Sequence, residues 1–228
     1  MDTLKTQPFT SYLTAQKLTN QPARFKQNQS RFEHAVVIGS SFAGLTAARV
    51  LSDYFALVTI IDRDGSPDPN EFRRGAPQTR HAHRLLPRGQ MILEQQFPGL
   101  VDELLALGAV AIEDGEDISF DYEGGWQATP YRRNWVSLSC SRPLLDATIY
   151  RRLAAFPNVS FLQGYEATGL MVNGRREQAA GVQLLCRRCQ SDAFELSADL
   201  VVDASGRNSK APQWLESLAY TPPEQCSI

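Results

Sequence analysis

The stretch His34–Asp64, which reads HAVVIGSSFAGLTAARVLSDYFALVTIIDRD, decides the fold. It begins with Ala35–Ile38, a short continuous apolar run that ends at a glycine and is typical of a strand buried on both faces. Apolar residues then recur at helical spacing over Gly44–Phe55, and Leu57–Ile61 predicts a second buried strand. Strand, helix and strand in this order predict a βαβ unit and therefore a parallel sheet.

The turn between the first strand and the helix has the sequence Gly39-Ser40-Ser41-Phe42-Ala43-Gly44. The pattern G-x-G-x-x-G at this place is the fingerprint of a dinucleotide-binding site. Its first glycine permits the tight turn, and its third lets the helix pack closely on the strand. Ser41 replaces the middle glycine. We expect this small residue to leave the backbone accessible to a pyrophosphate at the N-terminus of the helix.

An acidic residue closes the second strand. Asp62 lies 23 residues after Gly39, where a carboxylate can accept hydrogen bonds from ribose hydroxyls and would repel a 2′-phosphate. We therefore predict that Asp62 and its neighbour Arg63 belong to the site and that NADP fits it poorly. The alternative is a βαβ unit whose glycines serve turn geometry alone.

A polar loop rich in Pro and Arg follows over residues 63–80, and patterned segments resume after it. Helices are predicted over Leu85–Phe97, Leu100–Leu107 and Leu144–Phe156. Strands are predicted over Ile118–Tyr122, Trp135–Cys140, Val159–Leu162, Ala167–Val172, Gly181–Leu185 and Leu200–Asp203.

Two later motifs extend the pattern of the βαβ unit. Ser141-Arg142-Pro143-Leu144-Leu145 opens a predicted helix, and Asp203-Ala204-Ser205-Gly206-Arg207 follows a predicted strand. Together with Gly39, Ser41, Gly44 and Asp62, these segments resemble FAD-dependent oxidoreductases of the para-hydroxybenzoate hydroxylase, geranylgeranyl reductase and flavin halogenase type. The resemblance covers residues 34–225, with the motifs in the expected order.

The resemblance implies FAD as the cofactor. In such enzymes the arginine that opens the helix lies beside the flavin phosphate and ribitol, and the loop after the last strand packs near the pyrophosphate. This sequence has Ser205-Gly206 where the hydroxylases have an Asp-Gly linked to both FAD and NADPH binding, so it is more similar to the reductase, cyclase and halogenase branches. The alternatives are a solvated helix start at Arg142 and a strand-end turn without ligand contact.

The residues expected to bind FAD come from all these segments, whereas no catalytic residue and no metal ligand is assigned. They are Gly39, Ser40, Ser41, Phe42, Ala43, Gly44, Asp62, Arg63, Arg142, Ala167, Asp203, Ser205 and Gly206.

The expected fold class is α/β. A Rossmann-like FAD-binding domain with a mainly parallel sheet is expected over 34–113 and 141–218, with a small antiparallel part of an incomplete substrate domain over 114–140. Residues 1–33 are predicted to be a disordered tail and 219–228 a truncated tail. The Gly-Asp dipeptide that such enzymes use at the ribitol does not occur in the sequence, which favours a truncated enzyme or one chain of a split enzyme.

The composition of the chain limits the kinds of partner that we expect it to bind. A net charge of -2, with 43% hydrophobic and 21% charged residues, gives no reason to expect nucleic acid. No apolar run approaches the roughly 18 residues of a membrane helix, and we expect a soluble, cytoplasmic protein. The Cys186-Arg-Arg-Cys189 pair lacks the further ligands of a zinc site, so ordinary thiols are expected.

A histidine pair lies in the loop after the second strand. His81 and His83 follow the segment Arg74-Gly75-Ala76-Pro77-Gln78, at the place where relatives have a loop that faces the flavin ring. Three interpretations stay open: a histidine that acts as acid or base, a pair of metal ligands without an evident third, and a solvated loop.

Three functions compete at this point. The first is an FAD-dependent oxidoreductase of monooxygenase or reductase type that acts on an apolar or aromatic small molecule by hydroxylation, reduction or halogenation. The second is a catalytically incomplete FAD-binding remnant, or a subunit that needs a partner chain. The third is an NAD-binding module, which the Arg142 and Asp203–Arg207 regions disfavour.

Overall fold

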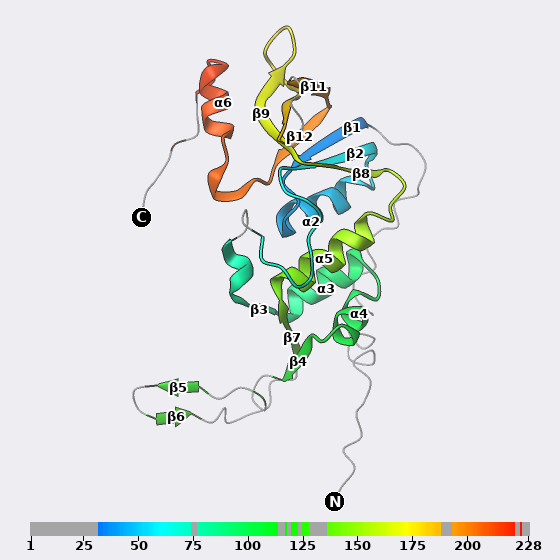
Figure 1. Cartoon of the computed structure of the whole chain (residues 1–228), viewed down its shortest axis with the longest axis vertical. Helices are drawn as coiled ribbons and strands as arrows, with labels where there is room; N and C mark the ends of the chain where they lie inside the picture. Colours follow the sequence, from blue (N-terminus) through cyan, green and yellow to red (C-terminus); the bar gives the residue numbers. More distant parts are fainter. Residues whose placement is uncertain are drawn as a thin grey trace, which may run out of the picture.

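The structure is a computed structural model and describes residues 32–73, 77–113, 117, 120–122, 125–127, 136–187, 193–221 and 224. Its centre is a four-stranded sheet of order β12-β1-β2-β8, in which all neighbouring strands run parallel (Figure 1). The strands are β1 (Phe32–Ile38), β2 (Phe55–Asp62), β8 (Val159–Gln163) and β12 (Leu200–Asp203).

Strand β1 is buried on both faces because a layer of structure covers each side of the sheet. Ala35 and Val37 pack into a core formed with the helices, whereas Val36 and Ile38 pack into a second core against an antiparallel sheet. All four residues are at most 7% exposed. The continuous apolar run in the sequence is thus explained by two cores rather than one.

Four helices form the layer on one face of the parallel sheet, below it in Figure 1. They are α2 (Phe42–Leu51), α3 (Pro87–Gln96), α4 (Leu100–Ala106) and α5 (Arg142–Leu153). Helix α5 starts with a Pro at its first turn, where the missing N–H leaves no hydrogen bond unmade. Leu45 of α2 and Ile149 of α5 are completely buried in this core.

The other face carries an antiparallel sheet of order β11-β10-β9. It consists of β9 (Tyr165–Val172), β10 (Ala179–Cys186) and β11 (Phe194–Ser197), and α6 (Ala211–Ser217) packs beside β9 (Figure 1). Trp214 of α6 joins the core under this sheet.

A second antiparallel sheet, of order β3-β7-β4, lies at the far end of the helical layer (Figure 1). It consists of β3 (Ala82–Leu85), β4 (Val110–Glu113) and β7 (Val136–Ser141). Strands β5 (Phe120–Tyr122) and β6 (Gly125–Gln127) pair separately, and short 3-10 helices cover Pro77–Arg80 and Gly206–Asn208.

The α/β fold with a parallel sheet and an antiparallel part is confirmed, although antiparallel strands outnumber parallel ones among the described residues. Three local corrections follow. The helix predicted to reach Phe55 ends at Leu51, because the chain turns over residues 52–54 and Phe55 starts β2, stacked on Phe32. Strands β3 and β4 were not predicted, since four-residue strands that pair only with β7 leave little periodicity in the sequence.

The third correction concerns the Cys-x-x-Cys pair. Cys186 is disulfide-bonded, so the expected free thiol at this position is wrong. Its partner lies outside the described residues, as do the segment Arg74-Gly75-Ala76 and residues 1–31 of the tail predicted over 1–33. Phe32 and Glu33, the last two residues of that predicted tail, belong instead to β1, where they extend the parallel sheet.

Candidate dinucleotide-binding site

The turn between β1 and α2 needs its two outer glycines for different geometric reasons. Gly39 has φ +101°, and its N–H donates to the carbonyl oxygen of Ile61 at 2.7 Å. A side chain on Gly39 would also lie 2.7 Å from the carbonyl oxygen of Ala204. At Gly44, a Cβ would lie 1.8 Å from the carbonyl oxygen of Gly39, so the helix can approach the turn only without a side chain there.

Ser41 is compatible with this turn because its backbone does not require glycine. It is the N-cap residue of α2, with φ −84° and ψ −179°, which any residue can adopt. The first turn of α2 contains no acidic residue. The ten-residue helix therefore presents unpaired N–H groups and the positive end of its dipole at Ser41, as an anion site requires.

Asp62 lies at the carboxyl end of β2 and is only 9% exposed. Its Oδ2 accepts hydrogen bonds from the N–H and the hydroxyl of Ser40, both at 2.7 Å, and its Oδ1 accepts from the N–H of Asp64 at 2.8 Å. The carboxylate therefore holds the glycine-rich turn against the end of β2, besides any contact with a ribose.

Arg73 is a site residue that the sequence did not single out. Its guanidinium lies 3.0 Å from Asp62 Oδ2 and donates to the carbonyl oxygen and the hydroxyl of Ser40, at 2.9 and 3.1 Å. The side chains of Arg73 and Asp62 are each 10% exposed. No spacing rule selects this residue from an arginine-rich loop, and the ion pair with Asp62 exists only because the loop folds back over the turn.

These residues border a cavity of about 400 Å³. Seven of the predicted site residues line it, namely Gly39, Ser40, Ser41, Asp62, Arg63, Ala167 and Ser205. Tyr165 and Trp214 add aromatic surface, and Lys210 and Glu166 form an ion pair of 3.3 Å at its edge. The cavity thus joins an anion-binding helix N-terminus, a carboxylate and an aromatic wall.

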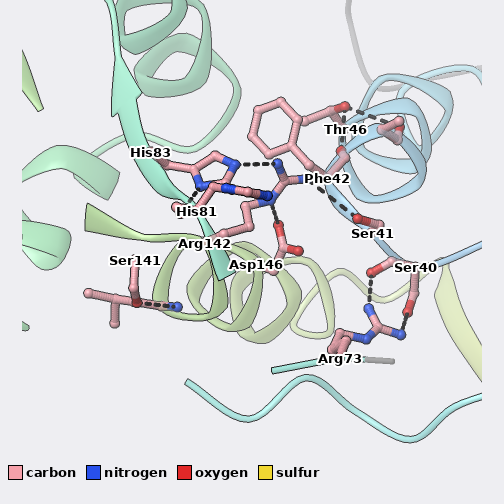
Figure 2. Close-up of polar contacts among 12 residues, drawn as sticks. Ser40, Ser41, Phe42, Thr46, Arg73, His81, His83, Ser141, Arg142 and Asp146 are labelled. Atoms are coloured by element: carbon pink, nitrogen blue, oxygen red, sulfur yellow. Dashed lines mark hydrogen bonds and ion pairs between the residues drawn. The ribbon is translucent and has the colours of Figure 1, made fainter. Parts of the chain in front are cut away.

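Arg142 lies beside the same helix N-terminus, at the start of α5. Figure 2 shows its guanidinium between Ser41, His83 and Asp146, with the ring of Phe42 next to it. Its Cζ is 5.0 Å from the centre of the Phe42 ring. The structure therefore brings a cation next to the turn that carries the glycine-rich motif.

Six predicted residues do not line the cavity: Arg142, described above, and the five that follow. Phe42 and Ala43 start α2, and Gly44 is buried against Gly39. Asp203 folds its own loop, because its Oδ1 accepts from the N–H of Ser205 at 2.9 Å. Gly206, with φ +81°, provides the backbone turn that follows.

The histidine pair is arranged for a contact with Arg142. The Nδ1 of His83 lies 2.8 Å from the carbonyl oxygen of His81, and its Nε2 lies 3.4 Å from Arg142 Nη1. Across the described residues, no group of three or more His, Cys, Asp and Glu side chains is placed to hold a metal ion. Within the same ranges, no helix is both long and apolar enough to cross a membrane.

Comparison with known sequences gives one curated relative and no matching family profile. Protein Rv3254 of Mycobacterium tuberculosis is 35% identical over 202 residues, which are 86% of this chain and 42% of that protein. The chain therefore spans less than half the length of this relative.

Comparison with solved structures gives monooxygenases, among them flavin-dependent ones. The p-nitrophenol 4-monooxygenase PnpA of Pseudomonas putida has a TM-score of 0.59 and 16% identity, over 81% of this chain and 43% of its own. PqsL of Pseudomonas aeruginosa, solved with 2-aminobenzoylacetate, has a TM-score of 0.58 and 16% identity, over 86% and 48%.

PieE, a flavin-dependent monooxygenase solved with FAD and substrate, has a TM-score of 0.54 and 16% identity, over 82% of this chain and 33% of its own. At such identities the likeness concerns the fold. The chain therefore has the fold of a part of the flavin-dependent monooxygenases that amounts to between a third and half of each of these three enzymes.

Proposed function

We propose that this chain binds FAD as part of a flavin-dependent oxidoreductase, of monooxygenase or reductase type, that acts on an apolar or aromatic small molecule. The observation that carries the proposal is the cavity beside the N-terminus of α2, with Asp62 at one side and Arg142 close to the same turn.

The residues present fit the parts of FAD. The N-terminus of α2 and the guanidinium of Arg142 would hold the pyrophosphate, because both supply N–H donors and positive charge. Asp62 Oδ1 would accept a hydroxyl of the adenosine ribose, and Tyr165 and Trp214 would flank the adenine. The bound flavin would supply the redox chemistry, while the protein binds and orients it.

One observation favours FAD over NAD as the dinucleotide. Arg142, 3.4 Å from the Ser41 hydroxyl, would support the pyrophosphate of either dinucleotide, so the preference for FAD rests on the structural neighbours. The structural neighbours that support the proposal are flavin-dependent enzymes, among them PieE solved with FAD. The pairing of Asp62 with Arg73 also weakens the argument that the carboxylate alone repels a 2′-phosphate, so NADP needs a direct test.

The proposed substrate class rests on the neighbours as well. PnpA is named for p-nitrophenol and PqsL was solved with 2-aminobenzoylacetate, both of which are aromatic compounds. We propose the same class of substrate for the present chain. No particular compound is assigned, and no choice is made among hydroxylation, reduction and halogenation.

Titration calorimetry of the purified chain with FAD, FMN, NAD and NADP tests the cofactor. We expect FAD to bind most tightly and the FAD-loaded protein to keep flavin absorbance near 450 nm after gel filtration. A chain that binds FAD no better than NAD would refute the proposal.

A second measurement separates binding from turnover. FAD-loaded protein is mixed with NADH or NADPH, with and without simple phenols, and flavin reduction is followed without oxygen. Reduction that depends on the phenol supports the oxidoreductase, whereas FAD binding without reduction supports the alternative of a subunit that needs a partner chain.

A further inference from the structure

The guanidinium of Arg142 is held by three different partners, one for each nitrogen. Nε donates to Asp146 Oδ1 at 2.7 Å, Nη1 lies 3.4 Å from His83 Nε2, and Nη2 donates to the Ser41 hydroxyl at 3.4 Å (Figure 2). These contacts use three of the five N–H groups of an arginine. One N–H on each terminal nitrogen is left for other acceptors near the N-terminus of α2.

Asp146 is the strongest of these partners and the most unusual one. Its side chain is completely buried on α5, one helical turn after Arg142. Its Oδ1 is bonded to Arg142, but its Oδ2 has no hydrogen-bond partner among the residues that the structure describes. A buried carboxylate with one unpaired oxygen lowers stability, so packing alone does not account for an aspartate here.

His83 contacts Arg142 in one protonation state only. The carbonyl oxygen of His81 can only accept, so His83 Nδ1 carries the proton of that 2.8 Å hydrogen bond. An arginine can only donate, so Nε2 of His83 must be without a proton to accept from Arg142. The neutral ring therefore supports the guanidinium from β3, while Asp146 fixes it from α5.

We propose that Asp146 is a positioning residue of the FAD pyrophosphate site, which holds the Arg142 guanidinium at the N-terminus of α2. This inference rests on the proposed function. Asp146 would not touch FAD itself but would keep the planar fork of Arg142 oriented toward the phosphate oxygens, where two parallel N–H groups match a phosphate.

The chain contains a matched pair for comparison. Arg49 and Asp53 have the same residue types at the same i,i+4 spacing, with Nη1 of Arg49 2.9 Å from Asp53 Oδ1. The side chain of Asp53 is 51% exposed, and the pair lies at the opposite end of α2 from Ser41. Asp53→Asn therefore removes the same charge from the same kind of pair outside the site.

The test is a double-mutant cycle on FAD binding with Asp146→Asn, Arg142→Ala and the double variant, measured by calorimetry. We expect Asp146→Asn to weaken FAD about tenfold. In the Arg142→Ala background, Asp146→Asn should have no further effect, because the residue acts through Arg142. Riboflavin, which has no phosphate, should bind all variants equally, and Asp53→Asn should bind FAD like the unchanged chain.

Thermal unfolding without FAD distinguishes positioning from a structural role. Burial raises the pKa of Asp146, an effect that the positive charges of Arg142 and Arg73 partly oppose. Because folding raises this pKa, the ionised carboxylate costs stability at pH 7, and the cost is absent below its ordinary pKa. Asp146→Asn should therefore keep or raise Tm at pH 7, and its advantage should shrink as the pH falls toward 4.

Three results would overturn the inference. An Asp146→Asn chain that binds FAD as tightly as the unchanged chain removes the positioning role and leaves the FAD proposal intact. Equal losses for FAD and riboflavin, together with a lower Tm, would mean that Asp146 only supports the fold. An unchanged chain that binds no FAD would overturn both the inference and the proposed function.

Discussion

Gly44 packs against the carbonyl oxygen of Gly39 so closely that a β-carbon at position 44 would lie 1.8 Å from that oxygen. Gly39 in turn takes a left-handed φ of +101° and donates its N–H to Ile61. These two glycines close the turn that brings the N-terminus of α2 to the end of β2. The site therefore depends on backbone contacts that no other residue type permits.

Gly44→Ala should lower the free energy of unfolding by about 2–4 kcal/mol, because the new methyl group meets backbone rather than a flexible side chain. Urea unfolding followed by circular dichroism measures the change. Gly89→Ala is the control, since a Cβ at Gly89 in α3 has no atom within 4 Å. That variant should gain about 0.5–1 kcal/mol, and equal effects at the two positions would contradict the assigned geometry.

Local patterns in the sequence were sufficient for β1, α2, β2 and the glycine-rich turn between them. Each element there has its own signal: a continuous apolar run, a 3.6-residue period, or a glycine that a tight turn needs. The positions of Asp62 and Ala167 at the cavity also agree with the expectation. Whether they bind FAD stays a prediction.

Residues that come together only through tertiary contacts were not predictable in this way. Arg73 reaches Asp62 because the loop after β2 folds back on the turn, and a loop has no period that specifies its path. His83 reaches Arg142 because β3 pairs with β7 directly before α5, with Ala82 opposite Ser141. Asp146 lies in the predicted helix Leu144–Phe156, where nothing in the sequence distinguishes it from an exposed polar residue, but the structure buries it completely.

Asp62→Asn should both destabilise the chain and weaken FAD binding. An asparagine has one acceptor oxygen, so either Ser40 or Asp64 loses its acceptor and Arg73 loses its counter-charge. We expect a loss of about 1–3 kcal/mol in the free energy of unfolding and a roughly tenfold weaker FAD complex. Asp102→Asn, on the exposed side of α4, serves as the control. Unchanged binding in Asp62→Asn would exclude Asp62 from the site.

The fluorescence emission of Trp214 should change when a ligand occupies the cavity. It lines the cavity together with Tyr165, at the end that we assign to the adenine. ADP, which lacks the flavin, should therefore quench its emission, and Trp214→Phe should lose this quenching while binding FAD about 3–10-fold more weakly. If saturating ADP leaves the emission of Trp214 unchanged, the adenine lies elsewhere.

Cys140 should react slowly with alkylating reagents in the folded chain, and its reaction rate should depend on the charge of Asp146. Burial and, to a lesser extent, the negative charge of Asp146 raise the pKa of the Cys140 thiol to about 11, although Arg142 partly offsets both effects. Because only the thiolate reacts, such a pKa leaves about a hundredfold less reactive thiol at pH 8 than an ordinary cysteine has. Iodoacetamide labelling, located by peptide mass spectrometry, should be correspondingly slow in buffer and fast in urea.

Asp146→Asn removes one of the two causes of that raised pKa, so native Cys140 should react faster in this variant, whereas Asp53→Asn should leave the rate unchanged. Each variant is labelled at the same number of degrees below its own Tm, so that differences in local unfolding do not account for a difference in rate. A rate in Asp146→Asn equal to that of the unchanged chain would mean that Asp146 carries no charge at pH 8. In that case Arg142 would be held by a neutral acid, and its guanidinium would keep its full charge toward a pyrophosphate.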